Sequence, residues 1–291
     1  MPSLVYGQIR EAFRYLNPNQ VRDLASRPLN VGLIASSHEG FAAMEALLAP
    51  ASLSQARRVE TVRSLHRVDD TGPEREFDLV ICEQELLPPC GAFLFDRDRP
   101  EATVQAILDR REDLSLALAS NFLPFRKPVI ARVIRAIARE NAAFSVVTAL
   151  PDVIPSLIEL PWAVGEFASD TAFLTMNQVR MAFQIAGASD QDVGYKQQRA
   201  QIAGIVAGAF GWRALARELV GKIPFGGGLV PKAAIAYAGT YTVGVGLERF
   251  YRIGSGLTRT ERREVYRQAL DRGRTIVDAI VQGARRQNPA A

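Results

Sequence analysis

Residues 29–42 read LNVGLIASSHEGFA, in which an apolar strand at 29–35 runs through a short polar turn into a helix expected over 41–48. Alternation of apolar and polar residues at 58–68 predicts a half-exposed strand. The other expected strands are short apolar runs at 77–82, 92–95, 114–119 and 143–148, and the helices among them lie at 101–111 and 129–141. Strands that alternate with helices predict an α/β fold with a parallel sheet covered on both faces.

The turn at 35–42 has the layout of a phosphate-binding loop without the side chains that hold phosphate. Such a loop reads GxxxxGK[ST]; its lysine contacts the terminal phosphates and its hydroxyl binds magnesium. Only the second glycine is kept, as Gly40. Ala35 replaces the first glycine, Phe41 the lysine and Ala42 the hydroxyl residue. The sequence therefore predicts neither catalysis nor a nucleotide cofactor at this turn.

Two further positions correspond in order to GTPase motifs, but the residues that recognise or hydrolyse the nucleotide are missing there. After the expected strand at 114–119, where a GTPase reads NKxD to recognise guanine, the sequence runs Asn121-Phe-Leu-Pro124. No DxxG motif follows the strand at 77–82. Residues 29–150 therefore resemble a degenerate P-loop GTPase-like domain, preceded by an amphipathic helix within residues 1–28. An unrelated α/β fold with an ordinary strand–turn–helix is the alternative.

The 291-residue chain carries few of the side chains that catalysis and metal binding use most often. Its two histidines leave little room for a Ser-His-Asp triad or a histidine-rich metal site. Cys82 and Cys90 are expected to be reduced thiols. The acidic pairs stand at the ends of expected loops and strands, where charged side chains are normally solvated; they are Asp69-Asp70, Glu83/Glu85 and Asp96/Asp98. We therefore predict no catalytic residue and no metal site.

The second half, residues 151–291, is expected to be all-α, because no period-two segment follows residue 150. The expected helices are 158–188, 195–210, 212–223, 232–252 and 258–286, with breaks at 224–231 and 254–256. Thr258 and Glu261 have the spacing of a capping box. This half carries 17 basic and 12 acidic side chains, against 18 and 19 in residues 1–150, which favours an anionic partner. Nucleic acid is disfavoured, because no binding motif accompanies the basic positions.

Several segments between residues 141 and 250 occur in an order that is similar to the bacterial family typified by YcjF. They are Thr148-Ala-Leu-Pro-Asp152, Asn177-Gln178 with Met181, Gly211 before Arg213, Pro224 with its glycine run, and Thr240 with Gly244. The resemblance implies an apolar helical domain that accompanies a GTPase, without an assigned reaction. It also implies membrane association on the cytoplasmic side of the inner membrane.

Two sets of residues in this half are candidate contact residues. Gly204, Gly208 and Gly211 form a small-residue face that lets helices approach closely, in lipid or in a packed core. Gly239 and Gly244 give the apolar run at 233–247 a similar character. The candidate contacts for anions such as lipid head groups are Lys222, Lys232, Arg262 and Arg263. The longest charge-free runs, 200–212 and 233–247, are shorter than the about 20 residues that a spanning helix needs.

These features predict a non-enzymatic, membrane-associated scaffold or regulatory module that acts with a GTPase or by self-association. One alternative is a soluble helical protein that oligomerises or binds partners through residues 200–247. The other alternative is an enzyme whose site is not recognisable from sequence.

Overall fold

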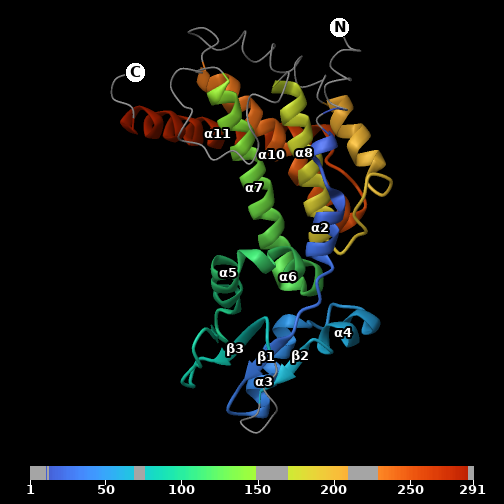
Figure 1. Ribbon diagram of the computed structural model, residues 1–291, viewed down its shortest axis with the longest axis vertical. Helices are drawn as coiled ribbons and strands as arrows, with labels where there is room; N and C mark the ends of the chain where they lie inside the picture. Colours follow the sequence, from blue (N-terminus) through green and yellow to red (C-terminus); the bar gives the residue numbers. More distant parts are fainter. Residues whose placement is uncertain (1–10, 12, 69–75, 149–169, 209–228, 288–291) are drawn as a thin grey trace. The chain divides into compact units, whose positions relative to one another are not determined.

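The computed structural model describes residues 11, 13–68, 76–148, 170–208 and 229–287 (Figure 1). The chain forms two compact units. The sheet unit comprises Asn19–Ala131 with Ala186–Asp192, and the helical unit comprises Met1–Pro18, Arg132–Ile185 and Val193–Ala291. The boundaries between them include Pro18/Asn19, Ala131/Arg132 and Ile185/Ala186, each of which falls inside a helix.

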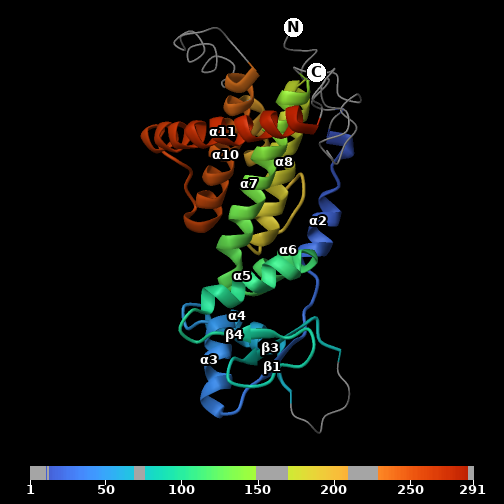
Figure 2. The ribbon, with the colours of Figure 1, turned by 90° about the vertical axis from the view of Figure 1, so that its left-hand side faces the viewer.

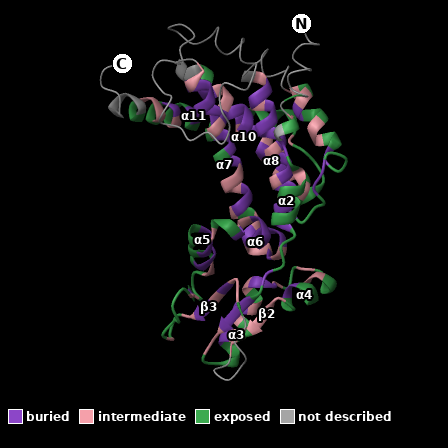
Figure 3. Ribbon diagram, in the orientation of Figure 1, coloured by how far each residue is buried: buried purple, intermediate pink, exposed green. Residues whose placement is uncertain are grey.

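The sheet unit is built on a four-stranded parallel sheet with the order β2-β1-β3-β4. The strands are β1 Val31–Ile34, β2 Leu65–Arg67, β3 Leu79–Glu83 and β4 Phe93–Phe95. Val31 pairs with Leu65 on one side and with Leu79 on the other, so β1 is a central strand. Its side chains are mostly buried (Figure 3), as expected for a strand between two neighbours in a parallel sheet. The apolar runs around 29–35, 77–82 and 92–95 are thus confirmed as parallel strands.

Helices pack on this sheet through buried apolar side chains. α3, His38–Leu48, contacts β1, and α5, Pro100–Arg110, contacts β4. Met44 of α3 and Ile107 of α5 are fully buried. The strand residues Leu33 and Ile81 are at most 1% exposed. The unit also contains most of α2, Pro18–Ala25, together with α4, Gln55–Val62, and α6, Ser115–Asn121. The strand–turn–helix predicted at 29–48 is therefore the centre of the unit's core.

Three segments that the sequence predicted as strands are wholly or partly helical. The expected strand at 58–68 contains the end of α4 before the short β2, the one at 114–119 lies chiefly in α6, and the one at 143–148 ends α7, Leu123–Val147. The segments at 114–119 and 143–148 are short apolar runs, which look the same in a buried helix as in a buried strand, so periodicity did not separate the two cases. For α4 the decisive residue is Ser54, whose hydroxyl accepts a hydrogen bond from the Arg57 N–H and starts the helix.

The helical unit is formed by long helices. They are α7 from Arg132 onward, most of α8, Asp170–Ala188, a helix at 199–208, α10, Leu229–Ile253, and α11, Arg259–Gln287. α11 lies across α10 (Figure 2), and the two make extensive contact. Their shared core joins side chains of α7, α10 and α11, namely Ala138, Ala142, Val146, Ala233, Tyr237, Ala238, Tyr266, Ala269 and Val277. Among the described residues, no helix combines the length and apolarity needed to cross a bilayer.

The break between α10 and α11 follows the sequence prediction. Gly254 adopts a positive φ of 76°, a conformation that glycine tolerates best, and ends α10. Thr258 and Glu261 then form the expected capping box, in which the Thr258 N–H donates to the Glu261 carboxylate at 2.9 Å and the Glu261 N–H donates back to the Thr258 hydroxyl at 3.3 Å. Most of the helix expected at 3–16, and residues 158–169 and 212–223, lie outside the described residues.

Candidate functional site

The first candidate site lies where β1 and β3 end, at the carboxyl edge of the sheet. In a sheet of order β2-β1-β3-β4 the chain leaves β1 toward one side and β3 toward the other. Ligands of doubly wound folds bind at such a switch point, outside the carboxyl ends of the strands. Here the turn Ser36-Ser37 follows β1, and Glu83 is the last residue of β3.

The carboxylate of Glu83 occupies the position where the turn would hold an anion. Both the backbone N–H and the hydroxyl of Ser36 donate to Glu83 Oε2, each at 2.8 Å. A Cβ atom added to Gly40 would lie only 2.5 Å from Glu83 Oε1, so the glycine allows the carboxylate to approach α3 closely. A helix N-terminus preceded by such a turn attracts anions through its free N–H groups. In this chain the anion at the turn is the carboxylate of Glu83.

The charge of Glu83 follows from the same contacts. Hydrogen bonds from the Ser36 N–H and then from its hydroxyl lower the pKa of Glu83, opposed by partial burial and helped by Arg97. Glu83 is therefore ionised at neutral pH and repels phosphate. Phe41, at the position of a phosphate-binding lysine, lies under the guanidinium of Arg67 at 4.8 Å from ring centroid to Cζ. The side chain at the lysine position is therefore apolar, and the Arg67 guanidinium above it lies 3.7 Å from the Glu45 carboxylate.

The remaining acidic residues do not assemble into a metal site. Asp69-Asp70 lie outside the described residues, and Glu85 is exposed. Asp96 accepts hydrogen bonds from the N–H groups of Asp98 and Arg99, both at 3.0 Å, and so shapes the turn before α5. Within the described part of the chain, no group of three His, Cys, Asp or Glu residues could hold a metal ion.

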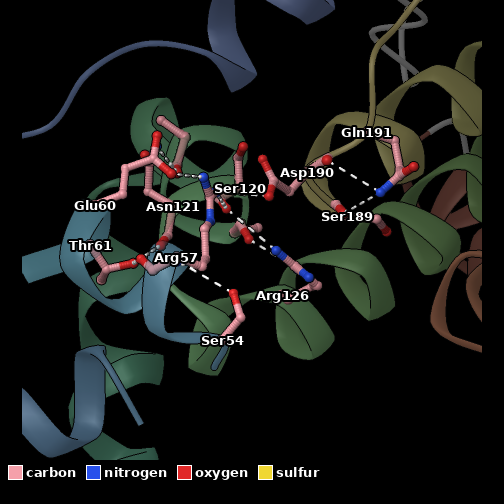
Figure 4. Close-up of polar contacts among 12 residues, drawn as sticks. Ser54, Arg57, Glu60, Thr61, Ser120, Asn121, Arg126, Ser189, Asp190 and Gln191 are labelled. Atoms are coloured by element: carbon pink, nitrogen blue, oxygen red, sulfur yellow. Dashed lines mark hydrogen bonds and ion pairs between the residues drawn. The ribbon is translucent and has the colours of Figure 1, made fainter. Parts of the chain in front are cut away.

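A second polar cluster, which sequence reasoning did not single out, surrounds the carboxyl end of α6 (Figure 4). Arg57 donates to the Ser120 carbonyl at 2.9 Å and pairs with Asp190 at 2.9 Å. Arg126 donates to the same carbonyl and to that of Ala119, each at 3.4 Å. Burial raises the pKa of Asp190, although the positive charges of Arg57 and Arg126 act in the opposite direction. Burial also lowers the pKa of Arg126. Cations at a helix carboxyl end satisfy free carbonyls, so the cluster acts as a structural clamp.

A buried amide network crosses the helical unit. The Asn141 side-chain amide donates to Thr240 Oγ1 at 2.7 Å and accepts from the Asn177 amide at 2.9 Å, while Gln178 donates to Thr240 at 3.3 Å. Asn141, Asn177 and Thr240 are at most 1% exposed. Two of the sequence segments on which the resemblance was based, Asn177-Gln178 and Thr240, thus meet in one network. Such a network fixes the helices in register.

The helical unit also contains a groove, which we call the α10–α11 groove. It lies between the helix at 199–208, the second half of α10 and the start of α11, and its volume is about 680 Å³. Ile205, Leu247 and Phe250 are among its apolar side chains, and Arg259 and Arg262 border it.

The predicted small-residue positions have different surroundings in the structure. Gly204 and Gly208 line the α10–α11 groove, and a Cβ at Gly204 would meet no atom within 4 Å. Gly244 instead packs tightly, because a Cβ there would lie 2.7 Å from Ile134 Cγ1 and 3.0 Å from Met181 Sδ. Gly239 is buried.

Of the four predicted anion contacts, Arg262 borders the α10–α11 groove and Arg263 is exposed on α11. Lys232 is exposed on α10. Lys222 and the predicted face residue Gly211 lie outside the described residues.

Comparisons of the chain with protein-family models, with curated proteins and with solved structures find no match.

Proposed function

We propose that this chain is a non-enzymatic regulatory or scaffold module whose sheet unit is a degenerate phosphate-binding fold. The observation that carries the proposal is that the Glu83 carboxylate accepts hydrogen bonds from both the N–H and the hydroxyl of Ser36. An internal carboxylate at the switch point satisfies the donors that a phosphate would need and adds a repulsive charge. The four-strand order matches the start of the flavodoxin-type order. A degenerate GTPase-like domain is the narrower form of this proposal, and its support is the layout of the turn at 35–42.

Nucleotide calorimetry tests the sheet unit. Wild-type protein titrated with GTP and with ATP, each with magnesium, should give no binding heat. Glu83→Ala should bind inorganic phosphate more tightly than wild type, because it frees the Ser36 N–H, whereas the exposed Glu85→Ala is the matched control and should not. Magnesium-dependent binding of GTP or ATP by wild type in the micromolar range would overturn the proposal.

The proposed place of action is an anionic membrane surface, on its cytoplasmic side, with the module contacting it peripherally. The support is the basic character of residues 151–291 and the exposed arginines of α11, among them Arg263 and Arg272. Basic segments bind anionic lipid surfaces electrostatically, and salt screens the attraction. By the family resemblance, the partner at that surface would be a GTPase.

Vesicle flotation tests the membrane contact. The full chain should float with vesicles of phosphatidylcholine and phosphatidylglycerol but not with phosphatidylcholine alone, and high salt should release it. Arg263→Glu with Arg272→Glu should abolish flotation, because both side chains are exposed on α11. If wild type does not float with either composition, the membrane proposal fails and self-association becomes the better explanation, to be measured by light scattering.

A further inference from the structure

The α10–α11 groove is apolar inside. Ile205 and Leu247, which line it, are buried, and Phe250, another lining residue, is 38% exposed. Thr242 adds little polarity, because its hydroxyl already donates to the Ala238 carbonyl at 2.7 Å. Among the described residues that line the groove there is no aspartate or glutamate. The interior therefore suits a hydrocarbon chain better than a polar ligand.

Glycines make room in the groove. A Cβ at Gly204 or Gly256 would meet no atom within 4 Å, and one at Gly246 would reach only Leu257 Cδ1, at 3.9 Å. These glycines are thus not required by close packing between the described helices. The volume of about 680 Å³ falls within the range typical of small-molecule sites, about 300–1,000 Å³. The missing side chains are what leaves this volume open.

Two arginines from the start of α11 line the groove. Arg259 and Arg262 come from the first turn of α11 and are exposed, and neither forms an ion pair within the described part of the chain. The nearby carboxylate of Glu261 is engaged by Thr258 and by Arg249, the latter at 2.5 Å. The two guanidinium groups are thus left for an anion from outside.

We propose that the α10–α11 groove binds one free amphiphile with a single alkyl chain and an anionic head group. The alkyl chain lies along Gly204, Ile205 and Leu247, and the head group lies between Arg259 and Arg262. Apolar burial supplies the affinity, and the arginine pair supplies the preference for a carboxylate or phosphate head. This site is separate from the surface that the flotation experiment tests, so the two proposals fail independently.

Calorimetric titration of the full chain with dodecanoate, below its micelle concentration and without vesicles, tests the proposal. Wild type should bind one equivalent, and decanoate, two carbons shorter, should bind about tenfold more weakly. Gly204→Leu should weaken dodecanoate binding at least tenfold by filling the groove. Gly283→Leu is the matched control, because Gly283 has equally open space but lies on α11 away from the groove, and its affinity should equal that of wild type.

The charge requirement has its own control. Arg259→Gln with Arg262→Gln should weaken dodecanoate binding about tenfold, whereas Arg263→Gln with Arg272→Gln removes the same charge elsewhere on α11 and should leave it within twofold. Circular dichroism checks that each variant is folded. Absence of dodecanoate binding by wild type, or equal affinities of the two glycine variants, would overturn the proposal.

Discussion

Gly244 should tolerate an added methyl group poorly. It lies in α10 and faces α7 and α8, where a Cβ would stand 2.7 Å and 2.9 Å from two carbons of Ile134 and 3.0 Å from Met181 Sδ. Ile134 is 4% exposed and Met181 is fully buried, so neither can move aside into solvent. Ile134 is also β-branched, which restricts its rotamers.

Two opposing terms set the size of the effect of Gly244→Ala. Replacing glycine by alanine inside a helix stabilises it by about 1 kcal/mol. Forcing an extra carbon into a packed core costs about 1–3 kcal/mol. We therefore expect Gly244→Ala to lower the free energy of unfolding by about 1 kcal/mol. Gly283→Ala, where open space removes the second term, should raise it by about 0.5–1 kcal/mol.

Urea unfolding followed by far-ultraviolet circular dichroism measures both variants against wild type. The midpoint should move down for Gly244→Ala and up for Gly283→Ala, with unchanged slopes. Gly244→Val should shift the midpoint further down. If Gly244→Ala proves as stabilising as Gly283→Ala, then α10 does not pack against Ile134 as described, and the assignment of Gly244 to a tight contact is refuted.

Thr240→Val should lower the free energy of unfolding, measured by urea titration, by about 1–3 kcal/mol, because it leaves two buried amide donors without their acceptor. A variant as stable as wild type would contradict the network. The Thr258 N–H and hydroxyl, followed by Arg249, lower the pKa of Glu261 from 4.5 to about 2, so the stability it contributes is complete above about pH 4.5 and is lost toward pH 2. Thermal melts of wild type and Glu261→Gln should therefore converge as the pH falls through this window; a difference that does not depend on pH would refute the charge effect. A thiol reagent should label exposed Cys90 rapidly and buried Cys82 only after unfolding, and rapid labelling of both would be the contrary result.

The central part of the sheet could be predicted from the sequence because its strands are short apolar runs bounded by turns. Residues 29–35 and 77–82 behave as parallel strands are expected to, with buried side chains on both faces. The run at 114–119 has a similar composition but forms α6, whose residues are buried all round. Burial on every side hides the helical period, so only the tertiary structure separates the two cases.

The candidate sites were predictable only where they depend on local sequence. Phe41 and Ala42 already indicate that the turn at 35–42 lacks the lysine and the hydroxyl of a phosphate-binding loop. The occupation of that turn by Glu83 could not be predicted, because it depends on β3 lying beside β1 across 47 residues of chain. The pairing of Arg57 with Asp190 is more distant still in sequence. No spacing rule joins residues so far apart.

The same limit applies to the glycines. In the sequence, the two apolar runs that contain Gly204 and Gly244 have a similar small-residue character. The structure gives the two glycines opposite surroundings, open space for one and close packing for the other. A glycine that makes room and a glycine that allows contact look identical in a sequence, because both report only the absence of a side chain.

The edges of the sheet bear on how copies of this chain can associate. Both edge strands, β2 and β4, are only three residues long. An edge strand recruits another chain through its row of unpaired backbone groups, and a row this short is a poor template for adding a strand. Sheet extension, domain swapping through a strand and fibril-like stacking are therefore disfavoured in the sheet unit. Association between folded copies should proceed through side-chain surfaces and remain reversible.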